Sequence, residues 1–190
     1  MGPIVEFLNQ PIVLTIITLA IGGYLVSTIT DRRARKDKRR EKAIDFLTDT
    51  GSTLNAIIST MYATLRRGKP YTDEAATEAF TDLFGRRMNI RVASEAYLNS
   101  ESFPTQYDQV LHELQAVAHF LRSRPKEPRT KRATRAIHER RVRLREAWPI
   151  ANEPPRPATD SANAELMLWL DMILDRVTAM LSSTLNAVMR

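Results

Sequence analysis

The sequence predicts an all-α protein in which a single N-terminal transmembrane helix precedes a cytoplasmic bundle of four to five helices. Three observations support this fold. Residues 7–30 carry no charge and are mostly apolar, and seven bases follow within residues 31–40. Through the rest of the chain apolar residues recur three and four positions apart, the period of an amphipathic helix. No segment shows the strict alternation of a half-buried strand.

Residues 1–30 are expected to form an N-terminal segment and a membrane anchor. About 20 apolar residues in a helix cover the roughly 30 Å hydrocarbon core, where the backbone must satisfy its own hydrogen bonds. The apolar run is not followed by a small-residue cleavage site typical of a signal peptide. We therefore expect an anchor that stays on the chain.

The basic juxtamembrane stretch, residues 31–42, predicts the orientation of the anchor. Cytoplasmic flanks of membrane helices are enriched in Lys and Arg, so the N-terminus should lie outside and the body inside the inner (plasma) membrane. Anionic headgroups would add about 1 kcal/mol for each base near the surface. The membrane-surface candidates are Arg32, Arg33, Arg35, Lys36, Lys38, Arg39 and Arg40.

The helical body, residues 43–148, begins with a helix that continues from the anchor and should end near Gly68. Its apolar residues are spaced three and four apart over three heptads. This seam is either part of the bundle core or a surface for self-association. Its members are Ile44, Leu47, Leu54, Ile58, Met61 and Leu65.

Two further helices are expected before residue 125. Thr72 followed by two acids favours a helix start, and Gly85 is a candidate break within that second helix. The third helix should begin near Ser102 and end before Pro125. Its predicted apolar stripe is Tyr107, Val110, Leu111, Leu114, Val117, Ala118 and Leu121.

A basic arm, residues 122–145, overlaps a predicted fourth helix from 129 to 148 with a thin apolar stripe. Three interpretations stay open: pairing with the acidic body, binding of anionic lipid or an acidic protein, and contact with nucleic acid. No helix-turn-helix or zinc-finger motif accompanies the arm. The candidate binding residues are Arg129, Lys131, Arg132, Arg135, Arg140, Arg141, Arg143 and Arg145.

A Pro-rich linker, residues 149–158, leads to an amphipathic C-terminal helix, residues 159–190. Asp171, Asp175 and Arg176 near its middle would cost roughly 8 to 10 kcal/mol in a membrane, which disfavours a second span. The helix should instead pack in the bundle or lie on the membrane surface.

The sequence offers little catalytic chemistry. It has no cysteine, and His112 and His119 are seven residues apart, too far for a metal pair on adjacent turns. No phosphate-binding glycine loop or nucleophile elbow is present. We therefore expect no enzyme activity, no cofactor, no metal and no small-molecule substrate.

These features predict a membrane-anchored, non-enzymatic helical adaptor or scaffold on the cytoplasmic face. It would recruit a protein partner or self-associate as a homo-oligomer, with membrane lipid bound through the anionic headgroups. One alternative is a membrane-tethered nucleic-acid-binding protein that uses residues 122–145. Another is a membrane-acting effector that uses the C-terminal helix. The Arg-rich composition is typical of a GC-rich bacterium or its phage.

Overall fold

The computed structural model describes a large part of the chain in two compact units, Met1–Lys42 and Ala43–Arg190. Among the residues whose backbone is described, side chains are described from Arg33 onward, except at 73, 75–77 and 79. The described backbone comprises residues 11–67, 73–98, 100–122, 131–151, 153, 156–159 and 161–190.

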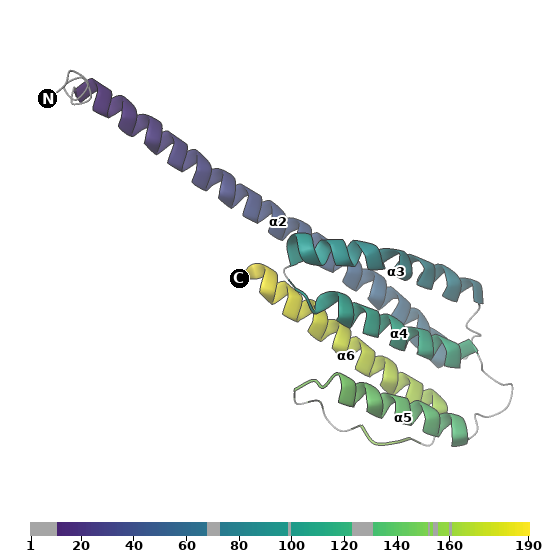
Figure 1. Cartoon of the computed structure of the whole chain (residues 1–190). Helices are drawn as coiled ribbons and strands as arrows, with labels where there is room; N and C mark the ends of the chain where they lie inside the picture. Colours follow the sequence, from purple (N-terminus) through teal and green to yellow (C-terminus); the bar gives the residue numbers. More distant parts are fainter. Residues whose placement is uncertain are drawn as a thin grey trace. The chain divides into compact units, whose positions relative to one another are not determined.

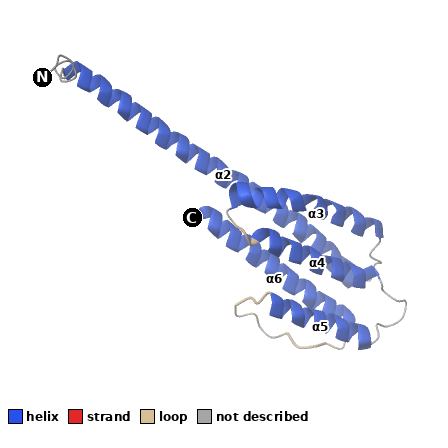
Figure 2. Cartoon of the chain, in the orientation of Figure 1, coloured by secondary structure: helices blue, strands red, loops and turns tan. Residues whose placement is uncertain are grey.

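Every regular element of the described residues is a helix (Figure 2), which confirms the predicted all-α class. The elements are α2 (Pro11–Arg67), α3 (Asp73–Ala93), the π-helix η1 (Ser94–Leu98), α4 (Phe103–Arg122), α5 (Lys131–Ala147) and α6 (Ala162–Met189). The predicted helix ends at Gly68 and Pro125 agree with the ends of α2 and α4 within a few residues.

Of the predicted membrane anchor, the structure describes only the backbone from residue 11 onward. The backbone of residues 11–30 is helical as part of α2, while residues 1–10 and the side chains of 11–32 are not described. Within the described part of the chain, no helix combines the length and the apolar character needed to cross a membrane.

In the second unit α6 is the central helix (Figure 1). It packs against α4, α5 and η1. It also meets α2, where Gly51 faces Leu181 and the Tyr62 hydroxyl donates to Asp171. Since these contacts pair rising numbers in α2 with falling numbers in α6, the two helices run antiparallel. The C-terminal helix therefore belongs to the bundle, which the sequence left undecided.

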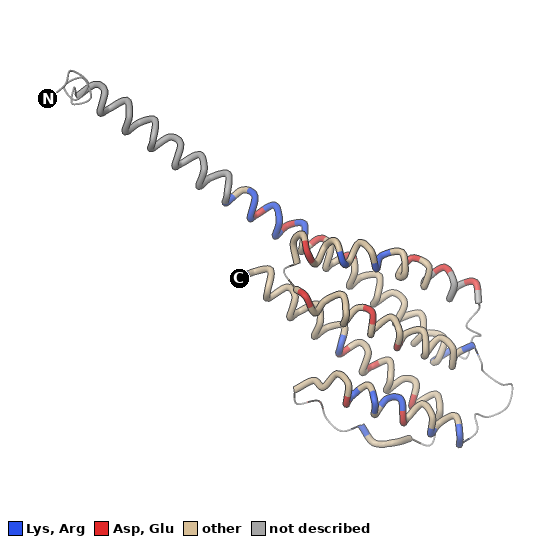
Figure 3. The backbone as a smooth tube through the Cα atoms, in the orientation of Figure 1, with Lys and Arg blue, Asp and Glu red and all other residues tan. Residues whose placement is uncertain are grey.

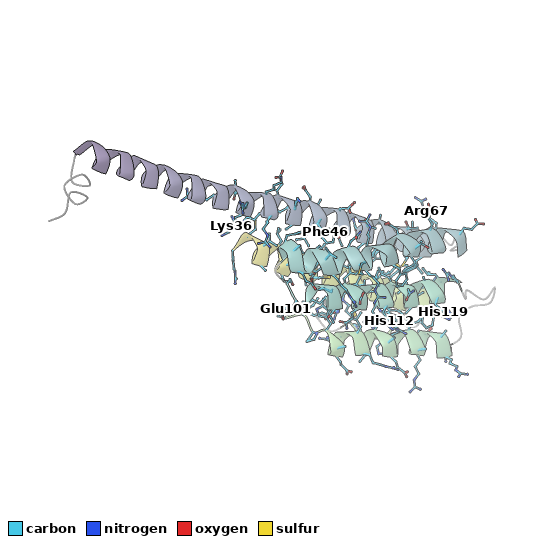
Figure 4. The ribbon with its side chains drawn as sticks, turned by 45° about the horizontal axis from the view of Figure 1, so that its top comes forward. Lys36, Phe46, Arg67, Glu101, His112 and His119 are labelled. Carbon is cyan, nitrogen blue, oxygen red and sulfur yellow. The ribbon has the colours of Figure 1, made fainter. Side chains whose placement is uncertain are left out.

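The core is formed by the apolar stripes that helical periodicity predicts. All seven predicted stripe residues of α4 are buried, together with Phe103 at the first position of that helix. Five members of the α2 seam are buried as well: Leu47, Leu54, Ile58, Met61 and Leu65. Phe46 of α2 lies edge-on to Tyr97 of η1 with ring centroids 6.0 Å apart (Figure 4). The seam is thus interior to this unit.

The structure refines two details of helix faces and breaks. Ile44 is 39% exposed, and Ala43 takes the buried position because it precedes Leu47 by four residues on the same face. Gly85 does not break α3, which continues to Ala93. The irregularity comes instead at η1, where the backbone widens to a π-helix before the turn into α4.

Candidate functional site

The basic arm is the main candidate site, and three of its bases, Arg140, Arg141 and Arg145, contact other parts of the bundle. Figure 3 shows Lys and Arg gathered in the stretch after residue 32 and in α5. In α5, Arg135 pairs with Glu139 one turn away at 2.9 Å. Arg140 lies 3.5 Å from Glu113 of α4, and its guanidinium stands over the Trp169 ring of α6 at 5.5 Å. In these contacts the charges of Arg135 and Arg140 are paired with carboxylates of the same chain.

Arg141 corrects the prediction of an exposed basic surface, because only 2% of the residue is exposed. It lies between Ile137 and Leu144 on the buried face of α5. Its Nε donates to Glu165 Oε2 of α6 at 3.0 Å. Its Nη2 donates to Nδ1 of His138 at 3.1 Å, and a guanidinium has only donors, so Nδ1 is the acceptor. A side chain held in this way is unavailable to an external ligand.

We call residues 148–161 the strap, because this segment runs from α5 to α6 and is bound by side chains of both. Arg141 donates to the carbonyl oxygens of Arg156 and Pro157 at 2.9 and 3.0 Å. The fully buried Glu165 accepts from the Thr159 backbone N–H at 2.6 Å. The predicted Pro-rich linker is therefore attached to the bundle through buried charges.

Arg176 of α6 makes a second buried ion pair beneath the strap. It donates to Glu153 at 3.0 Å and to the Trp148 carbonyl at 2.8 Å. Another bond from its guanidinium reaches the Met172 carbonyl one turn earlier at 3.0 Å. Three of its donors are thus satisfied by the strap and its own helix, which allows a charged side chain to be buried.

Tyr62 connects this network to α2. Its hydroxyl donates to Asp171, which also lies 3.5 Å from Arg156 of the strap. Burial, followed by the hydrogen bond to Asp171, raises the pKa of Tyr62 above that of an ordinary tyrosine. Arg156 pairs more closely with Asp175, at 2.6 Å. The network therefore links α2, the strap and α6.

Five of the seven bases of α5 are exposed, and they are mixed with acids. Lys131, Arg132 and Arg143 are exposed and form no ion pair with any described residue. Glu139 and Glu146 are exposed on the same helix, and Arg145 donates to the Glu153 carbonyl at 3.0 Å. Arg129 lies outside the described residues. The arm thus presents a weaker positive surface than its sequence suggests.

In the basic stretch, as in α5, most of the described bases are exposed. Arg33, Arg35, Lys36, Lys38 and Arg39 are exposed, whereas Arg40 is half-buried. The side chain of Arg32 is outside the described residues. The stretch belongs to the first compact unit, and Lys36 is marked in Figure 4.

A surface cleft of about 760 Å³ lies where α3, η1 and the start of α4 come together. Its lining combines Arg91 with three carboxylates, of which Asp108 already pairs with Arg87 at 2.7 Å. The Ser94 hydroxyl in this cleft is buried without a hydrogen-bond partner in the structure. Mixed charge around the opening singles out neither an anionic nor a cationic ligand.

The two histidines of α4 lie on its exposed surface (Figure 4). The described residues contain no group of three or more His, Asp or Glu side chains that could hold a metal ion. Neighbouring Glu113 instead accepts from the Trp169 indole N–H at 3.0 Å.

Comparison with known proteins adds no family to these observations: no family model, no curated protein and no solved structure matches the chain.

The buried charges are what reasoning from the sequence missed. No sequence pattern predicted the burial of Arg141, Glu165 and Arg176, yet each is at most 2% exposed. One signal was available for Arg141, which follows Ile137 by four residues and precedes Leu144 by three. It therefore occupies the gap in the apolar stripe of α5.

Proposed function

We propose that this chain is a single-pass membrane protein whose helical body acts as a non-enzymatic scaffold on the cytoplasmic face. The observation that carries the proposal is the change at Thr30, where an uncharged apolar run gives way to seven bases within ten residues. A run of this length matches the hydrocarbon thickness, and the bases after it favour the cytoplasmic side.

The character of the body supports a scaffold more than an enzyme. Buried charged side chains of the body pair with one another, as in Arg141 with Glu165 and Arg176 with Glu153. Such pairs hold segments of the body in place. The body then offers its surface for protein contacts, close to the membrane.

The experiment is a topology assay on the full chain, which contains no native cysteine. Single cysteines replace Gly2 and Met189 in separate variants expressed in bacterial cells. A membrane-impermeant maleimide should label position 2 in intact cells and position 189 only after lysis. Both variants should stay in the membrane pellet after carbonate extraction. Release of the chain by carbonate, or labelling of position 189 in intact cells, contradicts the proposal.

The matched variant for this assay replaces the bases of the basic stretch with Gln. Because Lys and Arg near the span determine orientation, we expect labelling of position 189 in some intact cells. The control replaces Lys131, Arg132 and Arg143, exposed bases in the helical body, and should keep the original labelling pattern. An unchanged pattern in both variants would mean that the bases of the basic stretch do not determine the orientation.

The nucleic-acid alternative is weakened by the contacts of α5, since Arg140 and Arg141 are engaged within the bundle. A competition assay tests it: full-length protein is incubated with DNA and with anionic vesicles at several salt concentrations. We expect anionic vesicles to compete effectively with DNA for the protein. The control variant at Lys131, Arg132 and Arg143 should bind DNA as the parent chain does. DNA binding that disappears in this variant would favour the alternative.

The effector alternative requires the C-terminal helix to leave the bundle. Trp169 and Leu170 of α6 are fully buried, so insertion of α6 into a membrane would expose the cores of its neighbours. We expect the folded chain to release no dye from anionic vesicles. Leakage that is abolished by a cross-link between α6 and α2 would favour the effector.

A further inference from the structure

Helix α3 has two apolar faces, and only one of them is covered within the described structure. Phe80, Leu83 and Ile90 are buried against the bundle. On the opposite side Phe84, Met88 and Val92 are 36%, 70% and 58% exposed. These three residues are spaced by four along the helix and therefore form one stripe. We call it the α3 stripe.

Met88 and Val92 of the α3 stripe are the most exposed large apolar residues among those described. Ion pairs hold the helix that carries them. Arg87 on one flank pairs with Asp108 of α4 at 2.7 Å and lies 5.9 Å from the centre of the Phe84 ring. On the other side of α3, Arg86 pairs with Asp82 and with Asp49 of α2. These ion pairs fix the rotation of α3 about its axis, so the stripe faces away from the bundle.

Gly85 widens this face. It lies beside Phe84 on the exposed side, and a Cβ placed there would meet no atom within 4 Å. A small residue next to large apolar ones allows the side chain of a facing helix to approach the backbone closely. The α3 stripe therefore has the relief of a helix-packing surface, with ridges at the large residues and a gap at the glycine.

The charges of α3 are segregated along its length. Its first half contains four acids and no base, and its second half contains three bases and no acid. The sum over the helix is slightly acidic, so an anionic lipid surface has no net attraction to it. Arg86, Arg87 and Asp82 form ion pairs within the chain, so the described charges that could face another helix are Glu74 and Glu78 in the first half and Arg91 in the second. A facing helix with the same segregation in the opposite direction would match these charges.

We propose that a second copy of this chain covers the α3 stripe by antiparallel pairing of the two α3 helices about a two-fold axis. In this arrangement the acidic half of each α3 lies along the basic half of the other, whereas a parallel pair would place like charges together. A two-fold contact uses the same patch on both copies. The α2 seam is not available for self-association, because five of its residues are buried in the core.

This inference rests on the proposed scaffold function and names the surface through which it self-associates. The first test measures the mass of the full chain in detergent micelles by sedimentation with correction for bound detergent. We expect a dimer for the parent chain. Met88→Asp should weaken dimerisation by roughly 30-fold or more, the effect of a central interface residue. A monomeric parent, or a dimer unaffected by Met88→Asp, overturns the proposal.

The matched control is Val142→Asp, which makes a similar change at a 40% exposed apolar residue of α5. It should leave the dimer intact. Circular dichroism of both variants checks the fold, because Met88→Asp must keep the parent's helical content for loss of the dimer to count. If Met88→Asp unfolds, Met88→Gln is measured in its place, and a dimer that persists in this variant overturns the proposal.

Cross-linking distinguishes antiparallel from parallel pairing. Thr81→Cys and Val92→Cys are made separately, two positions about 16 Å apart along the helix at 1.5 Å per residue. With a bismaleimide much shorter than that span, we expect strong cross-linking when the two variants are mixed and little in either alone. Cross-linking of each variant with itself overturns the antiparallel arrangement. The topology assay is independent of these outcomes, so failure of the dimer leaves the membrane proposal standing.

Discussion

Glu153 of the strap and Arg176 of α6 form an ion pair of 3.0 Å in which the two side chains are 4% and 1% exposed. Their separation in sequence means that neither helix formation nor local turns can bring them together. The pair exists because the strap passes over α6. Charged groups so fully withdrawn from water are held by each other and by backbone carbonyls, and removal of either leaves the other without compensation.

Glu153→Gln should therefore destabilise the folded chain by about 3 kcal/mol, because it leaves a buried guanidinium without its counter-charge. Glu146→Gln removes the same charge from an exposed position of α5 and should change the free energy of unfolding by less than about 0.5 kcal/mol. Urea unfolding followed by circular dichroism in detergent measures both. Equal effects of the two variants would show that the buried pair contributes nothing specific.

Arg141 and Arg143 offer a matched comparison two positions apart on one helix. Arg141→Gln should cost about 3–5 kcal/mol, since it strands the buried Glu165. Arg143→Gln changes an exposed residue and should be nearly neutral. Thermal unfolding of the two variants gives the difference directly. Similar melting temperatures would place Arg141 at the surface, contrary to the structure.

The α2 seam makes a prediction that separates core from interface. Leu54→Asp puts a charge at a site with no exposure and should unfold the body. Ile44→Asp, at the partly exposed member of the predicted seam, should leave the helical content unchanged. Circular dichroism checks the fold of each variant. If the Leu54→Asp chain folds and loses only its oligomeric state, the seam is an interface between chains.

Helical periodicity predicted the elements of this fold because each buries a continuous stripe. The seven residues foreseen for α4 are buried, as is Leu166 of α6. The charged interior escaped prediction for a physical reason: whether Arg141 is buried depends on Glu165, on a different helix and 24 residues away. The α3 stripe is the opposite case, since Phe84, Met88 and Val92 are large apolar residues that lie at the surface.

Gly51 tests how closely α2 and α6 pack. A Cβ at this position would lie 2.9 Å from Leu181 Cδ1, the end of a flexible and half-buried side chain. Gly51→Ala should be close to neutral, because a helix gain of about 0.5–1 kcal/mol offsets a small shift of Leu181. Gly51→Leu should destabilise by about 1–3 kcal/mol through overpacking. Chemical unfolding of the pair, with Gly85→Ala as an open-site control, measures both.

Alkaline pH should destabilise the fold through its buried tyrosines. Burial raises the pKa of Tyr107, whose hydroxyl donates to the Leu83 carbonyl at 3.1 Å. A raised pKa in the folded chain means that this stability is complete below the unfolded value of 10.0 and is lost as pH rises above it. One such group contributes about 1.4 kcal/mol per pH unit in that window.

Tyr107→Phe should therefore flatten the fall in stability above pH 10.0, at a cost of about 1 kcal/mol at neutral pH for the lost hydrogen bond. Tyr62, whose pKa is raised by burial and by Asp171, should contribute to the remaining slope. Unfolding measured between neutral pH and pH 11, with tyrosinate absorbance recorded alongside, gives the comparison. A slope that is the same in Tyr107→Phe and in the parent would mean that Tyr107 ionises freely in the folded chain.

Arg141 and Arg176 bind the strap mainly through hydrogen bonds to its backbone carbonyl oxygens. Arg141 and Arg176 together donate to the carbonyl oxygens of Trp148, Arg156 and Pro157, atoms that every amino acid carries. Except at Glu153, whose side chain pairs with Arg176, substitution within the segment keeps these acceptors, whereas an inserted or deleted residue moves them off their donors. The segment is permissive in composition and strict in length, so a peptide tag or fluorophore is better placed by replacing its exposed side chains than by lengthening it.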